Sequence, residues 1–352
     1  MLLIEAALII CIMILGIKAS ISDCRESVIP NELLIKMLPV ILLLDLLYYG
    51  LFASVYLENA LINLAFVSIF SFFLYSFNLW AAGDSKLVFL ITLAIPARLY
   101  SYWITGPFPG FILLVIIFSL AFIYVIADSI RLGIKNGDLL KINVSMFSLK
   151  SLIRSYFFMV GTMTVCNLLI IPIVRNVFSN VGLLITAVDF MIIFALRQVR
   201  EKADEKIINI YTIGIWVLLI ILQIMRIIPR MRFGIDVKAW LIVLIVMTLR
   251  LLAEKYNYQQ IKVDDLKPRM IPSAYTVISF RTSKVKGLPE GITEDLRSRL
   301  KEPEIDAIRR WSQTKQGKDT IIIVRKIPFA IFIFVGSLVF LLFEVVLLWR
   351  TY

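Results

Sequence analysis

Residues 1–31 read MLLIEAALIICIMILGIKASISDCRESVIPN. The apolar run at the start is long enough for a membrane helix, and a short polar stretch that begins at Asp23 follows it. Pro30 cannot continue a helix and Asn31 can cap the next one, so this stretch separates two helices. Apolar runs and short polar connectors alternate along the rest of the chain, which predicts a bundle of membrane helices.

The composition agrees with a membrane protein. The 352 residues are 60% hydrophobic and only 18% charged, and the mean hydropathy is +0.89. We expect spans near residues 1–17, 33–56, 60–80, 86–104, 110–130, 156–174, 180–196, 207–228, 238–252 and 328–349, of which 180–196 and 238–252 are short. The predicted fold class is an all-α polytopic membrane protein with about eight to ten transmembrane helices, and a small α+β domain near the C-terminus.

The lysines and arginines predict the orientation. The loop 131–155 carries five basic residues and one acid, whereas the connector 57–59 has only Glu58. Basic loops stay in the cytoplasm, so 131–155 is cytoplasmic and, by alternation, so are the stretches that hold Asp23 and Asp84. The N-terminus is then outside. The basic segment 226–238 conflicts with this alternation, which leaves the topology after the fifth span open.

Charge and cysteine usage exclude several classes of protein. The net charge is +12, but the basic residues lie mainly in loops between spans, so we expect a lipid bilayer rather than nucleic acid as the partner. There is no histidine, and the three cysteines form no CxxC pair, so we expect no metal site and no cofactor.

The chain divides into four parts. Residues 1–130 form a membrane core, 131–253 add further helices, 254–327 are polar and soluble, and 328–352 form a last span. Within the soluble part, 275–281 and 320–324 are rich in β-branched residues and are predicted to be strands. Helices are predicted to start at Thr293 and at Pro303 with Glu304. We expect this cytoplasmic domain to bind a substrate or partner, or to regulate access, without doing chemistry.

Two aspartates lie at the ends of predicted membrane helices. Asp23 and Asp84 are 61 positions apart (84 − 23) with two predicted spans between them, so both return to the same membrane face. Two carboxylates brought together can share one proton and activate water, which is the chemistry of an aspartic protease. Gly83 lacks a side chain, which allows a peptide or the other carboxylate to approach closely. Alternatively, Asp84 caps the helix that follows it, and Asp23 balances the charge of Arg25.

The motifs around the aspartates resemble one protein family. Residues 23–31 follow the pattern Asp-x-Arg-x-x-x-Ile-Pro-Asn, and 83–87 follow Gly-Asp-x-Lys-Leu. This combination resembles the type IV prepilin peptidases, together with the archaeal preflagellin peptidases, which are GxGD-type membrane aspartic proteases. The resemblance covers about residues 1–130, and 274–340 resembles more weakly the C-terminal extension of some archaeal members.

The resemblance implies a function and a site. It implies that Asp23 and Asp84 are catalytic, with Gly83, Lys86, Arg25, Pro30 and Asn31 as supporting or substrate-binding residues. The enzyme would be a multi-pass protein of the cell membrane that removes the short basic leader from prepilin-like or archaellin-like precursors at the cytoplasmic face. The chain departs from the family in having Ala81 where GxGD has its first glycine, and it lacks the cysteine-rich domain of bacterial members, which puts methyl transfer in doubt.

Three further acids support other interpretations. Asp45 and Asp189 fall within spans and Glu5 lies near the end of one, and acids inside a membrane are candidates for function. They allow a transporter that binds a proton or cation, although no repeated halves with broken helices are recognisable. A non-catalytic scaffold of a pilus-like assembly system is another alternative. The ordinary role for these acids is hydrogen bonding between helices.

Overall fold

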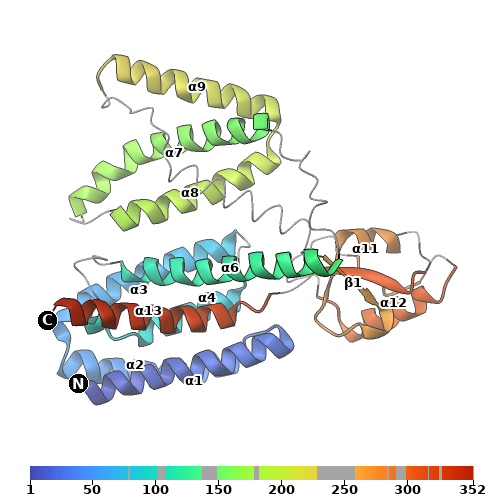
Figure 1. Ribbon diagram of the computed structural model, residues 1–352, viewed down its shortest axis with the longest axis horizontal. Helices are drawn as coiled ribbons and strands as arrows, with labels where there is room; N and C mark the ends of the chain where they lie inside the picture. Colours follow the sequence, from blue (N-terminus) through green and yellow to red (C-terminus); the bar gives the residue numbers. More distant parts are fainter. Residues whose placement is uncertain are drawn as a thin grey trace.

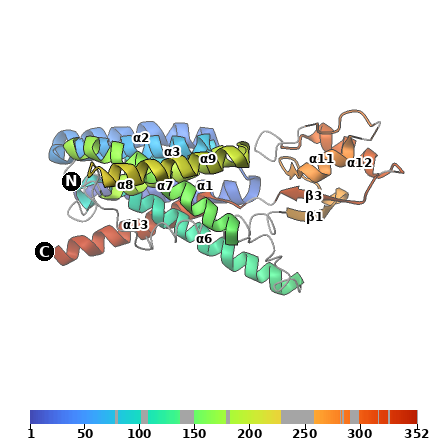
Figure 2. The same cartoon turned by 90° about the horizontal axis from the view of Figure 1, so that it is seen from above.

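The structure, a computed structural model, describes residues 1–77, 80–100, 108–136, 149–177, 182–227, 258–281, 283, 285–290, 299–315, 317–324 and 327–351. Long helices run side by side through most of the molecule, and a small α/β unit, residues 258–324, lies beyond one end of them (Figures 1 and 2). We call this end of the bundle the unit end. The N-terminus of α1 (Leu2–Glu26) and the end of α13 (Ala330–Thr351) lie at the opposite end (Figure 1).

Six of the described helices are long and apolar enough to cross a membrane. They are α1, α2 (Asn31–Leu51), α3 (Leu57–Ser76), α6 (Pro109–Asn136), α7 (Leu149–Val177) and α9 (Glu205–Ile224). The apolar segments of α8 (Gly182–Lys202) and α13 are 184–193 and 330–346, and they are shorter than those of the six candidate spans. The prediction of a helical multi-pass membrane protein is confirmed. The predicted span 238–252 lies outside the described residues.

The core of the bundle is formed by α1, α2, α3, α4 (Ala82–Ala94), α6 and α13. The last helix packs against α1, α4 and α6, although it is separated from them by most of the sequence. Close approach depends on glycine: a Cβ on Gly16 of α1 would lie 2.0 Å from the Phe334 ring of α13. Small residues at such crossings let helices pack tightly in lipid. The three helices α7, α8 and α9 pack together on one side of this core (Figure 1).

The fourth predicted span, 86–104, is wrong in extent. The helix α4 begins at Ala82 and ends at Ala94 after 13 residues, which is about 20 Å of helix. The residue before a proline is disfavoured in the α region, and Ile95 before Pro96 is extended at φ −78 and ψ 116. A short 3₁₀ turn, η2 (Ala97–Leu99), follows. This half-length helix begins at the unit end, between α2 and α3.

The α/β unit is built on a three-stranded antiparallel sheet in the order β1-β3-β2. Its strands are β1 (Tyr258–Lys262), β2 (Ile271–Pro272) and β3 (Thr320–Val324), and Tyr258 lies opposite Val324. Both helices, α11 (Ala274–Phe280) and α12 (Glu302–Ser312), lie on one side of the sheet (Figure 2). The buried Trp311 ring packs edge-on against Phe280, with 4.8 Å between ring centroids. The unit thus has its own apolar core.

The secondary structure predicted for this unit is partly wrong. The strand at 320–324 and the helix from Pro303 are confirmed, but 275–281 forms helix α11. The Ser273 hydroxyl accepts the Thr276 N–H at 3.2 Å and caps that helix, and burial of Val277 and Phe280 on one face favours helical spacing. The strands β1 and β2, which the sequence analysis did not identify, complete the sheet. The predicted helix start at Thr293 lies outside the described residues.

Candidate functional site

Asp23 lies in the last turn of α1. The prediction that it lies in a loop is wrong, because α1 continues to Glu26 and ends only where Ser27 adopts the left-handed conformation at φ 57. The Asp23 carboxylate accepts the backbone N–H of Ala330, the first residue of α13, at 3.1 Å. This hydrogen bond connects the end of α1 to the beginning of α13, which lies 307 positions further along the chain.

Asp84 lies in the first turn of α4. Its carboxylate accepts the N–H of Ala81, the residue that caps α4, at 3.0 Å. Asp84 therefore stabilises the start of the helix from within the first turn, and is not itself the cap. The same turn is fixed to α3, because the Ser85 hydroxyl donates to the Ser71 carbonyl at 3.2 Å. These contacts hold the Asp84 backbone in place.

The two aspartates line one cavity at the unit end, with a volume of about 280 Å³. We call it the aspartate cavity. Only 4% of Asp23 and 5% of Asp84 is exposed. The acids therefore reach a common site from opposite helix ends, Asp23 from the C-terminus of α1 and Asp84 from the N-terminus of α4. Both carboxyl groups are therefore placed to act on a molecule bound in this cavity.

The other predicted site residues differ in their positions. Gly83, Asn31 and Lys86 line the aspartate cavity. A Cβ on Gly83 would lie 3.3 Å from the Ile29 Cβ, so this glycine allows the α1–α2 connector to pack on α4. The prediction that Asn31 caps α2 is wrong, because Pro30 occupies the cap position. The exposed Arg25 is not among the described residues that line the cavity.

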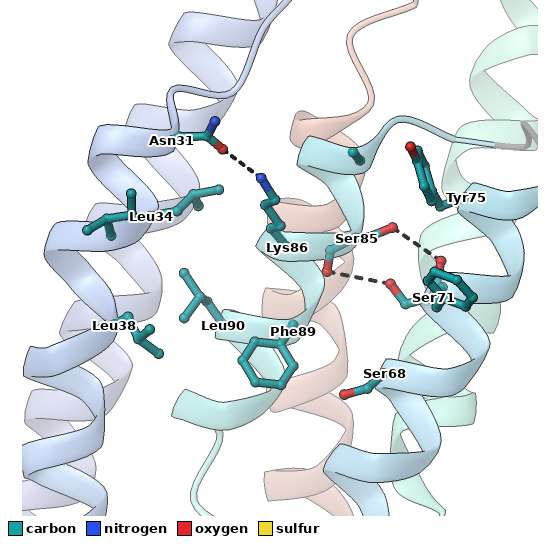
Figure 3. A pocket seen from close by; sticks show the side chains of 13 residues that line it. Asn31, Leu34, Leu38, Ser68, Ser71, Tyr75, Ser85, Lys86, Phe89 and Leu90 are labelled. Carbon is teal, nitrogen blue, oxygen red and sulfur yellow. Dashed lines mark hydrogen bonds between the residues drawn. The ribbon is translucent and has the colours of Figure 1, made fainter.

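Lys86 joins α4 to α2. Its Nζ donates to the Asn31 Oδ1 at 2.9 Å, and Figure 3 shows this contact bridging the two helices. Because Asn31 does not cap α2, its side chain is available to accept this hydrogen bond from Lys86. Lys86 and Asn31 also line a second hollow beside the aspartate cavity. The Lys86–Asn31 hydrogen bond therefore lies between the aspartate cavity and the second hollow.

The second hollow is an apolar groove between α2, α3 and α4, with a volume of about 560 Å³ (Figure 3). We call it the lateral groove. Leucines from α2 and α4 and the Phe89 ring line it, together with three serines, Ser68, Ser71 and Ser85. The serine hydroxyls are bonded to backbone carbonyls, which leaves the surface largely apolar. Asn31, Ala82 and Lys86 line both hollows, so the lateral groove and the aspartate cavity are neighbours.

Arg299 of the α/β unit also lines the aspartate cavity. Sequence reasoning missed it, because it belongs to no motif and lies 276 positions from Asp23 (299 − 23). Its Nη2 donates to the carbonyl of Ser27 at 3.2 Å. Desolvation by burial, followed by repulsion from Arg269, lowers the pKa of Arg299, while the charge of Asp23 raises it.

Glu5 and Arg98 form a buried pair at the far end of the bundle. The Arg98 guanidinium donates two hydrogen bonds of 2.7 Å to the two Glu5 carboxylate oxygens. The Tyr48 hydroxyl donates to the same carboxylate at 2.8 Å. Glu5 lies 18 residues before Asp23 on α1, which is about 27 Å along a helix. Glu5 therefore acts in helix packing and not at the aspartate cavity.

Asp189 and Asp45 lie in different surroundings. The Asp189 carboxylate accepts the amide of Asn167 at 2.7 Å, which joins α8 to α7. Asp45 on α2 is only 7% exposed, and its two oxygens have no hydrogen-bond partner among the described residues. It lines a hollow formed by α2, α3 and the end of α4.

We expect Asp45→Leu to stabilise the protein, by about 1–3 kcal/mol, because it removes a buried polar group that lacks a partner. Thermal unfolding in detergent, with Asp189→Leu as the comparison, checks this, since Asp189 loses a hydrogen bond and its variant should be less stable than the wild type. A marked loss of stability in Asp45→Leu would show that Asp45 has a favourable role.

No protein-family model, curated protein or solved structure matches this chain. Within the described residues, no group of three cysteine, aspartate or glutamate side chains is placed to hold a metal ion. The chemistry of the site is therefore argued from the side chains around the aspartate cavity.

Proposed function

We propose that the protein is a membrane aspartic endopeptidase of the prepilin-peptidase type. The observation that carries this proposal is the aspartate cavity, which Asp23 and Asp84 both line from separate helices with almost no exposure. The two motifs that resemble the prepilin peptidases are the ones that supply these acids. A pair of carboxyl groups in a common cavity is the arrangement that hydrolysis by shared acid–base catalysis requires.

The reaction needs only the pair and a water molecule. The ionised carboxyl takes a proton from water while the water oxygen bonds to the scissile carbonyl carbon, and the protonated carboxyl gives its proton to the carbonyl oxygen. In the second step the carboxyl that took the proton from water gives it to the amide nitrogen, and the C–N bond breaks. The other carboxyl takes a proton back from a hydroxyl of the tetrahedral intermediate. The products are a carboxylic acid and an amine, and the pair again holds one proton.

The distribution of charge supports a cytoplasmic location of the site. The end of α6 and the start of α7 lie at the unit end (Figure 1), and these helix ends carry Arg131 and Arg154. Basic residues favour the cytoplasmic side of a membrane. The enzyme is thus proposed to work at the cytoplasmic face of the cell membrane, where the basic leader of a prepilin-like or archaellin-like precursor lies.

The lateral groove supports a substrate with an apolar segment next to the scissile bond. The groove lies on the side of α4, extends from Asn31 to Leu38 on α2, about 10 Å of helix, and shares three lining residues with the aspartate cavity. A membrane-embedded segment of about seven residues in the groove would place the preceding peptide bond at the aspartates. The leader would then extend away from the membrane.

Filling the groove should weaken substrate binding. Ser68→Trp places a bulky ring in the lateral groove, and we expect KM for a precursor to rise about tenfold, equivalent to about 1.4 kcal/mol, with little change in kcat. Ile69→Trp is the matched control, because Ile69 neighbours Ser68 on α3 but is 65% exposed and does not line the groove. Equal KM values for the two variants would contradict this role of the groove.

The function itself is tested with precursors encoded in the same genome. The full chain is purified in detergent or nanodiscs and incubated with tagged prepilin-like precursors, and the new N-terminus is read by mass spectrometry. We expect a single cut between the basic leader and the apolar segment. A correctly inserted protein that cuts none of a panel of such precursors would contradict the proposal and favour a non-catalytic scaffold.

A further inference from the structure

A hollow between α7 and α9 has a volume of about 540 Å³. We call it the α7–α9 hollow. It is lined by Arg154 and Phe157 of α7 and by one face of α9 from Asn209 to Ile220. The Trp216 indole N–H donates to the Phe157 carbonyl at 2.9 Å, which joins the two helices beside the hollow. Among the described residues, the hollow shares no lining residue with the aspartate cavity or the lateral groove.

The hollow lies on a surface that faces lipid. Both α7 and α9 are candidate membrane spans, and only 11% of the apolar window of α9 is buried. Within the hollow, Phe157 is 43% exposed, Val217 48% and Ile213 65%. Exposed apolar side chains in the middle of a membrane span contact lipid chains instead of water. The natural occupant of the hollow is therefore a lipid.

An ion pair lies at one end of the hollow. The Arg154 guanidinium pairs with the Glu205 carboxylate. Arg154 is in the first turn of the candidate span Ile153–Asn176, and Glu205 begins the span Glu205–Ile224, so the pair lies at one membrane surface. The Glu205 side chain is 74% exposed and the Arg154 side chain 26%. Because a guanidinium has five N–H donors, Arg154 can bind a second anion beside this carboxylate.

The lining becomes apolar with distance from the ion pair. Asn209 lies four residues after Glu205 on α9, and Ile213, Val217 and Ile220 follow deeper in the span. From Asn209 to Ile220 the helix rises about 16 Å. One leaflet contributes about 15 Å to a hydrocarbon core of about 30 Å. The hollow thus has charges at the membrane surface and an apolar wall as deep as one leaflet, which is the order of groups in a single lipid.

We propose that the α7–α9 hollow binds one phospholipid whose headgroup carries both a phosphate and a primary amine. The phosphate accepts hydrogen bonds from Arg154, the ammonium donates to Glu205, and an acyl chain lies along α9. The two charges of the headgroup are thereby each matched by one charge of the ion pair. A headgroup without a cation leaves Glu205 unmatched, and a quaternary ammonium cannot donate a hydrogen bond to it.

The first test measures lipid binding to the full chain. The protein is purified in a detergent that removes bulk lipid and is titrated with phosphatidylethanolamine, phosphatidylcholine or phosphatidylglycerol of identical acyl chains. Native mass spectrometry counts the bound lipids. We expect one site for phosphatidylethanolamine with a Kd about tenfold below that of the other two lipids, equivalent to about 1.4 kcal/mol. Equal Kd values for the three lipids, or no such site, would overturn the proposal.

Two pairs of variants locate this site. Val217→Trp fills the apolar part of the hollow and leaves the Arg154–Glu205 pair in place, so the tight site should disappear. Leu218→Trp is its matched control, because Leu218 is 46% exposed and does not line the hollow. Arg154→Gln should raise the Kd about tenfold, whereas Arg131→Gln, an exposed position on α6 away from the lining, should not. Tight binding in both Val217→Trp and Arg154→Gln would place the lipid elsewhere and contradict the proposal.

Discussion

Asp23→Asn and Asp84→Asn are each expected to lower kcat for a prepilin-like precursor by at least about 10³-fold. Asparagine has the size of aspartate and can accept the Ala330 or Ala81 N–H, so the helix ends should keep their positions. It cannot take or give the proton that each step of hydrolysis moves. KM should change little, because the lateral groove, which is proposed to hold the apolar segment, is intact.

Purified variants and steady-state rates check this expectation. Asp45→Asn is the matched control, because it makes the same change at another buried aspartate that lies on α2 and does not line the aspartate cavity. It should cleave at the wild-type rate. If Asp45→Asn is inactive while either cavity variant retains full activity, the chemistry lies elsewhere, as in the transporter interpretation.

Glu5→Leu is expected to cause the largest loss of stability. It leaves the Arg98 guanidinium facing the bundle without the two 2.7 Å bonds that the carboxylate accepts. Breaking a buried pair on one side costs about 3–5 kcal/mol, and the lower end applies because 31% of the Arg98 side chain is exposed. Glu5 is far from the aspartate cavity, so the cleavage rate per folded molecule should stay unchanged.

A double-mutant cycle measures this pair. Unfolding in a denaturing detergent is followed for Glu5→Leu, Arg98→Leu and the double variant. The double variant should recover most of the lost stability, because neither charge is left alone. Additive losses would show that Glu5 and Arg98 stabilise the bundle independently.

The membrane helices could be predicted because lipid imposes a simple requirement. A helix in the membrane needs a long apolar run, so α1, α2 and α3 follow from hydropathy. The position of Asp23 and Asp84 at the same end of the bundle also follows, since two spans bring the chain back to the same face. The length of α4 was predicted wrongly because the apolar character of the sequence does not stop at Ala94, whereas Pro96 ends the helix through the conformation that it imposes on Ile95.

The remaining parts of the site depend on contacts between distant segments. The segment 275–281 contains β-branched residues, but the Ser273 cap and the burial of Phe280 against Trp311 make it a helix. Asn31 binds Lys86 in place of capping α2, and this needs α4 beside α2. Arg299 could not be identified from the sequence, because it reaches the aspartate cavity only where the α/β unit meets the end of α1.

The central claim is that Asp23 and Asp84 act as one catalytic pair, and a kinetic cycle tests it most directly. The rate of precursor cleavage is measured for the wild type, Asp23→Asn, Asp84→Asn and the double variant. We predict that the double variant is no slower than the slower single variant, because either change removes the shared proton and with it the whole mechanism. Losses that multiply in the double variant, or single variants that cleave like the wild type, would contradict the claim.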